Sequence, residues 1–253
     1  MKIIVLLLSL ISTVGYTAEI PSSFSKAKKL ALTKIYKDHH NTFYCGCSFN
    51  SKKQVDQASC GYVPRTPITA SGKENIRDNR IEWEHVLPAS KMGSHLACWG
   101  NERGQFPQCV KSNGKLKSGR ECCQKVNRDF RNAHNDLVNL TPAIGEVNAD
   151  RSNLPYAEII GEKRAYGQCD FEYDVTNKVV EPSSALRGDI ARIQLYLEQS
   201  YGEALGFKFS EHKKAMLERW NNKDPVSDWE IERNKRICKA QGSGNEFVGS
   251  CSL

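Results

Sequence analysis

The sequence predicts a single mixed α+β domain that is rich in disulfides. Short β-prone segments lie in the first half of the chain, amphipathic helical segments fill the last third, and the ten cysteines are even in number. No internal repeat, low-complexity linker or abrupt change in composition divides the 253 residues. A chain of this length can bury a substantial core in one domain.

The N-terminus predicts export. Met1 and Lys2 precede an apolar run from Ile3 to Val14, which is too short to span a bilayer and is typical of a signal peptide. We expect residues 1–18 to be the signal peptide and 19–253 to be the mature domain, located in the periplasm or secreted. No later segment is long and apolar enough for a membrane helix, so we expect no membrane partner.

Net charge and cysteine content indicate which kind of exported protein this is. Loss of residues 1–18 removes one Lys and no acid, which lowers the formal net charge of +7 by one, to +6. This excess favours polyanions, although it is also common in ordinary soluble proteins. Behind an export signal the cysteines predict disulfides, and their spacing does not match a structural zinc site. They are Cys45, Cys47, Cys60, Cys98, Cys109, Cys122, Cys123, Cys169, Cys238 and Cys251.

In the first half, helical spacing of apolar residues predicts a basic amphipathic helix over residues 25–37, which we interpret as a solvated outer face rather than a DNA-reading helix. Residues 41–63 predict a bridged, loop-rich region with short β-prone pieces. The alternation over residues 80–87 predicts a strand that Pro88 stops. Residues 93–123 lack periodicity and predict a long disulfide-held loop of functional importance.

In the second half, Thr141 followed by Pro142 has the pattern of a helix start. Three further helices are expected: one capped by Asp189 over residues 190–201, one beginning at Ser210, and one preceded by a capping box at Ser227 and ending near Gly242.

A set of polar residues could hydrolyse a phosphodiester, which requires a base, a cation and a positive side chain for the transition state. Glu84 and His85 are adjacent at a strand end, Arg120 lies on the long loop, and Glu146 and Asn148 follow Thr141. One carboxylate and one amide oxygen can hold Mg²⁺ with several waters. A structural surface pair is the alternative for Glu84 and His85. Neighbours on a regular strand face opposite sides, so both serve one site only if the strand breaks there.

Longer strings supply the context. In order and spacing, the chain resembles the bacterial endonuclease I family over nearly all of residues 19–253. The strings are F-Y-C-G-C (43–47), S-C-G-Y (59–62), E-W-E-H-V-L-P-A (82–89), G-R-E-C-C (119–123), N-L-T-P-A-I-G-E-V-N-A-D-R-S-N (139–153), R-G-D-I-A-R (187–192) and D-W-E-x-x-R (228–233).

The resemblance implies a ββα-metal nuclease core, export, and cleavage of double- and single-stranded DNA, and of RNA, without sequence specificity, which leaves 5′-phosphate ends. Carried over by motif, His85 is the general base, Glu84 and Asn148 are the ligands of Mg²⁺, and Arg120 binds the phosphate in the transition state. Mn²⁺ or Ca²⁺ could substitute for Mg²⁺. The family also suggests a monomer.

The chain departs from the family pattern at several places, among them Val138, where the family has His, and Cys122 and Cys123, which give one cysteine more than is common there. His134 stands where the family usually has Glu. We interpret this as a substitution at the periphery without a role in the site; the alternative is a protonated His134 that binds phosphate. The cysteine after D-W-E is replaced by Ile231, while Cys238 lies seven residues later on the same helical face, which makes a bridge to Cys251 a reasonable option. The rest of the connectivity stays open.

Two alternatives remain at this stage. The first is a secreted basic protein that binds polyanions without cutting them, with strong salt dependence and no need for His85 or metal. The second is a zinc hydrolase, which is disfavoured because H-E-x-x-H is absent and no other His falls at ligand spacing around His85.

Overall fold

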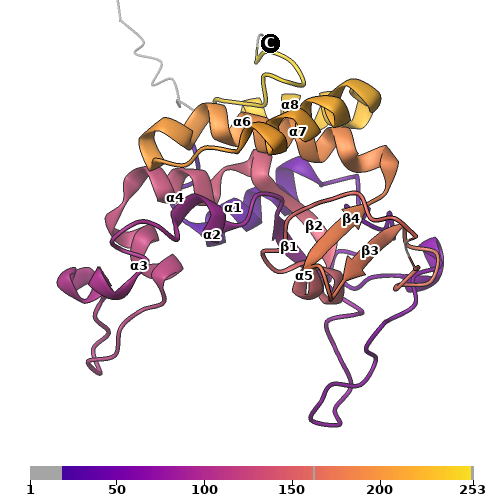
Figure 1. Ribbon diagram of the computed structural model, residues 1–253, viewed down its shortest axis with the longest axis horizontal. Coiled ribbons are helices and arrows are strands. Elements are labelled where there is room, and N and C mark those ends of the chain that lie inside the picture. The colour runs from indigo at the N-terminus through magenta and orange to yellow at the C-terminus, as the bar shows by residue number, and fades with distance from the viewer. Residues whose placement is uncertain (1–18, 162, 252–253) are drawn as a thin grey trace, which may run out of the picture.

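The computed structural model describes residues 19–161 and 163–251. The predicted signal peptide, residues 1–18, lies outside this range. A layer of long helices covers two small sheets, and two extended segments project away from that layer (Figure 1). The helices are α1 (Phe24–Leu30), α2 (Ala89–Gly93), α3 (Gly119–Val126), α4 (Arg128–Asn135), α5 (Gly145–Arg151), α6 (Arg187–Leu205), α7 (Glu211–Lys223) and α8 (Asp228–Gln241), and the strands are β1 (Ile81–His85), β2 (Leu140–Ile144), β3 (Phe171–Asp174) and β4 (Val179–Pro182). The prediction of one mixed α+β domain is confirmed.

The centre of the fold is a ββα unit. Strand β1 pairs antiparallel with β2 in a register that runs from Ile81 opposite Ile144 to His85 opposite Leu140. Helix α5 follows β2 without a connecting loop and contacts both strands. Gly145 permits this join, because a Cβ there would lie 2.7 Å from the carbonyl oxygen of Arg77.

The predicted helix start at Thr141 was wrong, because Thr141 and Pro142 lie in β2 and the helix begins at Gly145. The carbonyl oxygen of Pro142 accepts a hydrogen bond from Phe43 N at 2.7 Å, on the side away from β1. The nitrogen of a strand residue faces the same side as its oxygen, so the missing N–H of Pro142 removes no ladder bond. A hydroxyl residue followed by Pro can therefore lie in an edge strand as well as at a helix start, and here it lies in the strand.

Two of the three predicted C-terminal helices begin at the expected capping residues, and the third does not. Ser210 caps α7, and Ser227 forms a capping box with Glu230 before α8, which ends at the left-handed Gly242, as predicted. Helix α6, however, begins at Arg187, and Asp189 lies in its first turn rather than at its cap. The Asp189 carboxyl group instead lies 3.4 Å from the Arg192 guanidinium, one turn along the same helix, and makes no capping bond.

The predicted long loop over residues 93–123 is more ordered than the sequence indicated. It contains two 3₁₀ turns (Asn101–Gln105 and Pro107–Cys109), and its end forms the first turns of α3 behind a capping box of Ser118 and Glu121. The disulfides Cys98–Cys123 and Cys109–Cys122 tie the beginning and the middle of the segment to α3. Arg120 therefore lies on a helix, not on a loop.

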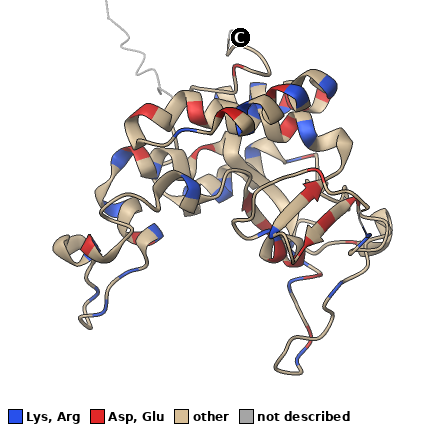
Figure 2. Ribbon diagram, in the orientation of Figure 1, with Lys and Arg blue, Asp and Glu red and all other residues tan. Residues whose placement is uncertain are grey.

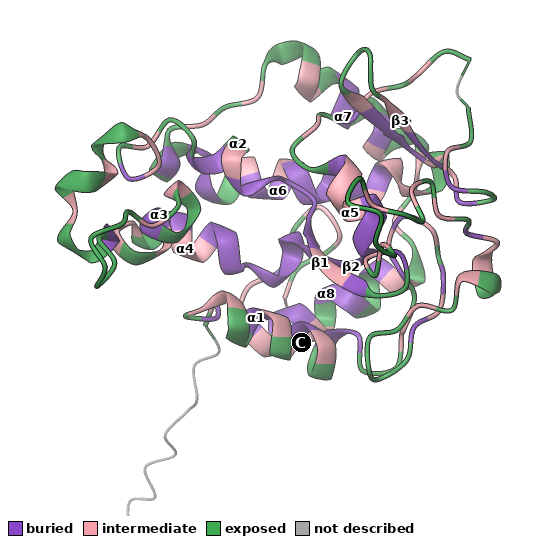
Figure 3. Ribbon diagram, turned by 90° about the horizontal axis from the view of Figure 1, so that it is seen from below, coloured by how far each residue is buried: buried purple, intermediate pink, exposed green. Residues whose placement is uncertain are grey.

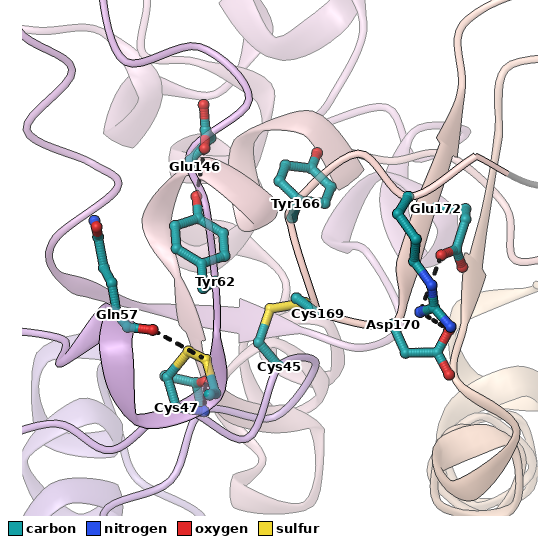
Figure 4. The surroundings of a disulfide bond; sticks show 12 residues. Cys45, Cys47, Gln57, Tyr62, Glu146, Tyr166, Cys169, Asp170 and Glu172 are labelled. Atoms are coloured by element: carbon teal, nitrogen blue, oxygen red, sulfur yellow. Dashed lines mark hydrogen bonds and ion pairs between the residues drawn. A yellow bond between two sulfur atoms is a disulfide. The ribbon is translucent and has the colours of Figure 1, made fainter.

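All ten cysteines are paired, which confirms the disulfide prediction. The remaining bridges are Cys45–Cys169, Cys47–Cys60 and Cys238–Cys251, the last of which was expected as an option. Cys45–Cys169 joins the N-terminal loop region to the chain just before β3 (Figure 4). The β3–β4 hairpin itself was not predicted from the sequence.

The first predicted helix is also present, as α1 followed by a π-helical turn over Ala31–Ile35, with its lysines facing outward. Elsewhere Lys and Arg are spread over the surface rather than gathered in one patch (Figure 2). The buried residues run beneath α6 and through β1, β2 and α5, so the ββα unit is set in the core (Figure 3). Within the described residues, no helix has the length and hydropathy to cross a membrane.

Candidate active site

One cleft brings the predicted site residues together. It has a volume of about 430 Å³, and its wall includes Glu84 and His85 from the end of β1, Arg120 from α3 and Asn148 from α5. The strand β1 ends at His85, ahead of Pro88, and the side chains of both Glu84 and His85 reach the cleft. The condition set by the sequence, that the strand must stop there for both residues to share a site, is met.

The proton on the His85 ring is fixed by a main-chain partner. Nε2 of His85 lies 2.8 Å from the carbonyl oxygen of His134. A carbonyl can only accept, so Nε2 carries the proton and Nδ1 is the basic nitrogen. Burial, followed by the nearby His134, holds the pKa of His85 well below its usual value. The imidazole is therefore neutral and able to accept a proton at neutral pH.

Glu84 is a buried carboxylate with two partners on one oxygen. Its Oε1 accepts a hydrogen bond from Tyr44 Oη at 2.8 Å and lies 3.1 Å from the Arg151 guanidinium. Burial raises the pKa of Glu84, while Arg151 and the Tyr44 hydrogen bond act in the opposite direction. Both contacts use Oε1, so the second oxygen, Oε2, is not used by either partner, and Glu84 lines the cleft.

Arg151, at the end of α5, contacts the end of β1 that carries Glu84 and His85. Besides Glu84, it donates to the carbonyl oxygens of His85 at 3.0 Å and Val86 at 2.6 Å, and its guanidinium lies over the Tyr156 ring. Its side chain is 1% exposed, so these contacts balance a charge removed from water. One arginine thus links α5 to the strand end that carries Glu84 and His85.

Asn148 is oriented by Glu82, two residues before Glu84 on β1. Asn148 Nδ2 donates to Glu82 Oε2 at 2.9 Å. Glu82 also pairs with Arg77 at 2.5 Å and Arg80 at 3.1 Å, which lowers the pKa of its carboxyl despite burial. Because a carboxylate only accepts, the Nδ2 side of the amide is fixed toward Glu82, and Oδ1 is left for another partner.

Arg120 approaches the cleft from α3. Its guanidinium forms no hydrogen bond or ion pair with any residue in the described part of the chain, and its side chain is exposed. Gly119 allows the start of α3 to pack tightly, because a Cβ at that position would lie 2.5 Å from the carbonyl oxygen of Trp99. The helix is thereby fixed while the arginine that it carries has its donors available.

Two other residues considered from the sequence do not face the cleft. Glu146 does not line the cleft and instead accepts hydrogen bonds from the backbone of Arg65 and Thr66 and from the Tyr62 hydroxyl, toward which it points in Figure 4. His134 is 1% exposed, and burial lowers its pKa to about 4, so a protonated His134 as a phosphate ligand is disfavoured. Its contribution is the carbonyl oxygen that holds His85.

The oxygen atoms of this cleft fit a hard divalent cation. Glu84 and Asn148 each present one oxygen that is not used by the partners described above, and Mg²⁺ accepts few protein ligands while keeping several waters. No group of three or more His, Cys, Asp or Glu residues suited to a metal occurs in residues 19–161 and 163–251. This donor set is poor for zinc, which prefers nitrogen and sulfur ligands in closed sites.

Sequence reasoning missed the supporting residues Tyr44, Glu82 and Arg151. Arg151 lies 67 positions after the Glu84 carboxylate that it contacts, and Tyr44 lies 40 positions before it. Ser152 was also missed; it lines the cleft with a φ of 49°, a backbone conformation uncommon for a residue with a side chain. The sequence signal for these residues was their position inside the family strings: Tyr44 in F-Y-C-G-C, Glu82 in E-W-E-H, and Arg151 and Ser152 in G-E-V-N-A-D-R-S.

Several known proteins resemble this chain over most of its length. The model of the family "Endonuclease I" matches residues 23–251. An extracellular deoxyribonuclease of Aeromonas hydrophila is 40% identical over 227 residues, which covers 88% of each chain. A periplasmic deoxyribonuclease of the same species is 38% identical over 88% of this chain and 84% of its own. An endonuclease-1 of Buchnera aphidicola is 36% identical over 89% of this chain and 80% of its own. The chain therefore belongs to the endonuclease I family.

Proposed function

We propose that the protein is an exported, Mg²⁺-dependent endonuclease that hydrolyses phosphodiester bonds of DNA and RNA without sequence specificity. The observation that carries the proposal is the single cleft in which a neutral imidazole, an unpaired arginine and two oxygen ligands meet. The location is supported by the names of the relatives, which are extracellular and periplasmic enzymes.

The chemistry follows from the atoms available. His85 Nδ1 takes a proton from the attacking water, while the Nε2–H bond to the His134 carbonyl keeps the ring in place and stabilises the imidazolium that forms. Arg120 donates to the phosphate oxygens as negative charge develops on them. Glu84 and Asn148 would hold the cation, which when bound neutralises phosphate charge and stabilises the leaving oxygen. Attack with loss of the 3′ oxygen leaves a 5′-phosphate.

Substrate breadth is also part of the proposal. The cleft offers arginine side chains that can bind a phosphate and oxygen atoms that can hold a metal ion. Contacts to phosphate carry no sequence information. We therefore expect both single- and double-stranded DNA, and RNA, to be cut by a monomer. Binding should weaken as salt rises, because counterions are released from the nucleic acid backbone.

The deciding experiment is nicking of supercoiled plasmid by the oxidised mature chain after exhaustive chelation, with and without restored Mg²⁺. Wild type is compared with His85→Ala and with His212→Ala, an exposed histidine on α7 that serves as a matched control. We expect cutting only with metal, a loss of about 10²–10⁴-fold in His85→Ala, and full activity in the control. If wild type binds plasmid in a salt-dependent way but never cuts, the protein is a polyanion-binding protein instead.

A further inference from the structure

A second pocket adjoins the catalytic cleft. It has a volume of about 270 Å³ and lies between the start of α2, the chain that follows α5, and the connection from α6 to α7. Pro88 lines both cavities, and the neighbours Ser90 and Lys91 line one each. The two cavities therefore lie next to each other at Pro88, within reach of one nucleic acid strand.

The charge of this pocket is positive and unbalanced. Three lysines line it, Lys91, Lys208 and Lys213, and no Asp or Glu does. Lys208 forms an exposed contact of 3.8 Å with Glu211, whereas Lys91 and Lys213 form no ion pair with any residue of the described chain. Burial, followed by the charges of Arg151 and Lys91, lowers the pKa of Lys213 to about 8. The pocket thus has the electrostatic character of an anion site.

Its remaining walls are apolar and aromatic. Phe207 and Phe209 from the α6–α7 connection line it together with Tyr156, whose ring lies 5.8 Å from Lys213 Nζ. A site for a free phosphate ion would not need this lining, whereas a nucleotide combines one negative group with one flat apolar group.

A buried acceptor without a partner points to the same ligand. Gln194 lines the pocket from α6, is 2% exposed, and its Oε1 forms no hydrogen bond within the described residues. Leaving such an atom unpaired costs free energy, so a ligand that donates to it gains affinity. Sugar hydroxyl and base amino groups are donors of this kind.

We propose that this pocket binds the nucleotide next to the one that is cut. Lys91 and Lys213 contact its backbone phosphate, Phe207, Phe209 and Tyr156 receive its base, and Gln194 accepts a hydrogen bond from it. The proposal rests on the proposed nuclease function, because it places the same strand in both cavities. A base can enter only when unstacked, so the pocket favours single-stranded substrate or locally opened duplex.

The test compares Lys213→Gln with Lys214→Gln, the neighbouring lysine that pairs with Glu198 at 3.3 Å and does not line this pocket. Steady-state hydrolysis is measured on a single-stranded oligonucleotide and on bis(p-nitrophenyl) phosphate, a small diester that fills only the cleft. For Lys213→Gln we expect KM on the oligonucleotide to rise about tenfold and KM on the small diester to change much less. The slope of log affinity against log salt concentration should be smaller in magnitude by about 0.7 for the oligonucleotide. Equal effects on both substrates, or none, would overturn the proposal.

A second variant tests the base. Phe209→Ala removes the ring but keeps the backbone N–H that donates to Glu198. We expect it to weaken binding of an ordinary oligonucleotide and to leave binding of an abasic oligonucleotide of equal charge unchanged; equal losses for both would contradict a base contact. These affinities are measured in His85→Ala, so they report on the pocket even if wild type proves not to cut, an outcome that would end the nuclease proposal alone.

Discussion

His85 Nε2 lies 2.8 Å from the main-chain oxygen of His134, and this bond sets which ring nitrogen is basic. The partner belongs to the backbone at the end of α4, so it does not depend on the side chain at position 134. The His134 ring instead packs against His85 and Phe24, with its centroid 4.5 Å from that of His85. The two histidines are therefore expected to respond very differently to substitution.

We predict that His134→Gln keeps kcat within about threefold of wild type, while His85→Ala loses about 10²–10⁴-fold. The reason is that the carbonyl remains in the first variant and the base is absent in the second. Plasmid cleavage by matched amounts of oxidised protein measures both, with circular dichroism as the control for folding. A loss in His134→Gln as large as that in His85→Ala would mean that the ring itself acts in the reaction.

Metal affinity should depend on Glu82, although we do not expect Glu82 to touch the metal. Glu82 fixes the Asn148 amide at 2.9 Å, and loss of such an orienting partner typically lowers metal affinity by about 10–100-fold. We predict this increase in the Mg²⁺ concentration for half-maximal activity in Glu82→Ala. Glu232→Ala, which removes an exposed carboxylate paired with Arg236, is the control. An unchanged Mg²⁺ requirement in Glu82→Ala would argue against Asn148 as a ligand.

The sequence predicted the helices that carry their own end signals. Ser210 and Ser227 cap α7 and α8 through bonds to residues three positions later, so a short window contains the whole signal. Thr141 with Pro142 gave a false start, because an edge strand accepts the same pair when the proline nitrogen faces away from its partner. The β3–β4 hairpin was missed, since its four-residue strands are too short for alternation to stand out.

In the candidate site, motif resemblance named Glu84, His85, Arg120 and Asn148, and all four line one cleft. The residues that orient them could not be found locally. Tyr44 and Arg151 reach Glu84 from 40 and 67 positions away along the chain, and the partner of His85 is a backbone oxygen with no residue signature. Such contacts depend on tertiary packing rather than on spacing along the chain.

Disulfides should affect activity according to their position. Cys109–Cys122 and Cys238–Cys251 each span 13 residues, so their loss should cost similar stability, about 3 kcal/mol in the chain-entropy account. Cys122 lies two residues after Arg120 on α3, whereas Cys238 is on α8. We predict that the double Ser variant of the first pair loses activity at 25 °C and that of the second pair does not. Urea unfolding checks the stabilities, and equal activities would show that α3 holds Arg120 without the bridge.

The last prediction concerns stability and pH. Burial and the nearby Glu230 carboxylate raise the pKa of Asp189 from its ordinary 3.8 to about 8. Between these values the folded chain holds a proton that the unfolded chain has lost, so stability present below pH 4 is lost as pH rises toward 8. One proton gives a slope of up to about 1.4 kcal/mol per pH unit. Asp189→Asn removes this term, so its stability should decline less steeply than that of wild type between pH 5 and 8.

Asp38→Asn is the matched control for this experiment. Asp38 is an exposed acid whose hydrogen bond with Arg236 lowers its pKa, so the stability it contributes is present above its unfolded pKa and lost only under more acidic conditions. Its substitution should therefore leave the slope between pH 5 and 8 unchanged. Urea unfolding at unit pH intervals gives all three curves. If wild type and Asp189→Asn run parallel, Asp189 is ionised in the folded protein, and Arg192 balances both carboxylates beside it.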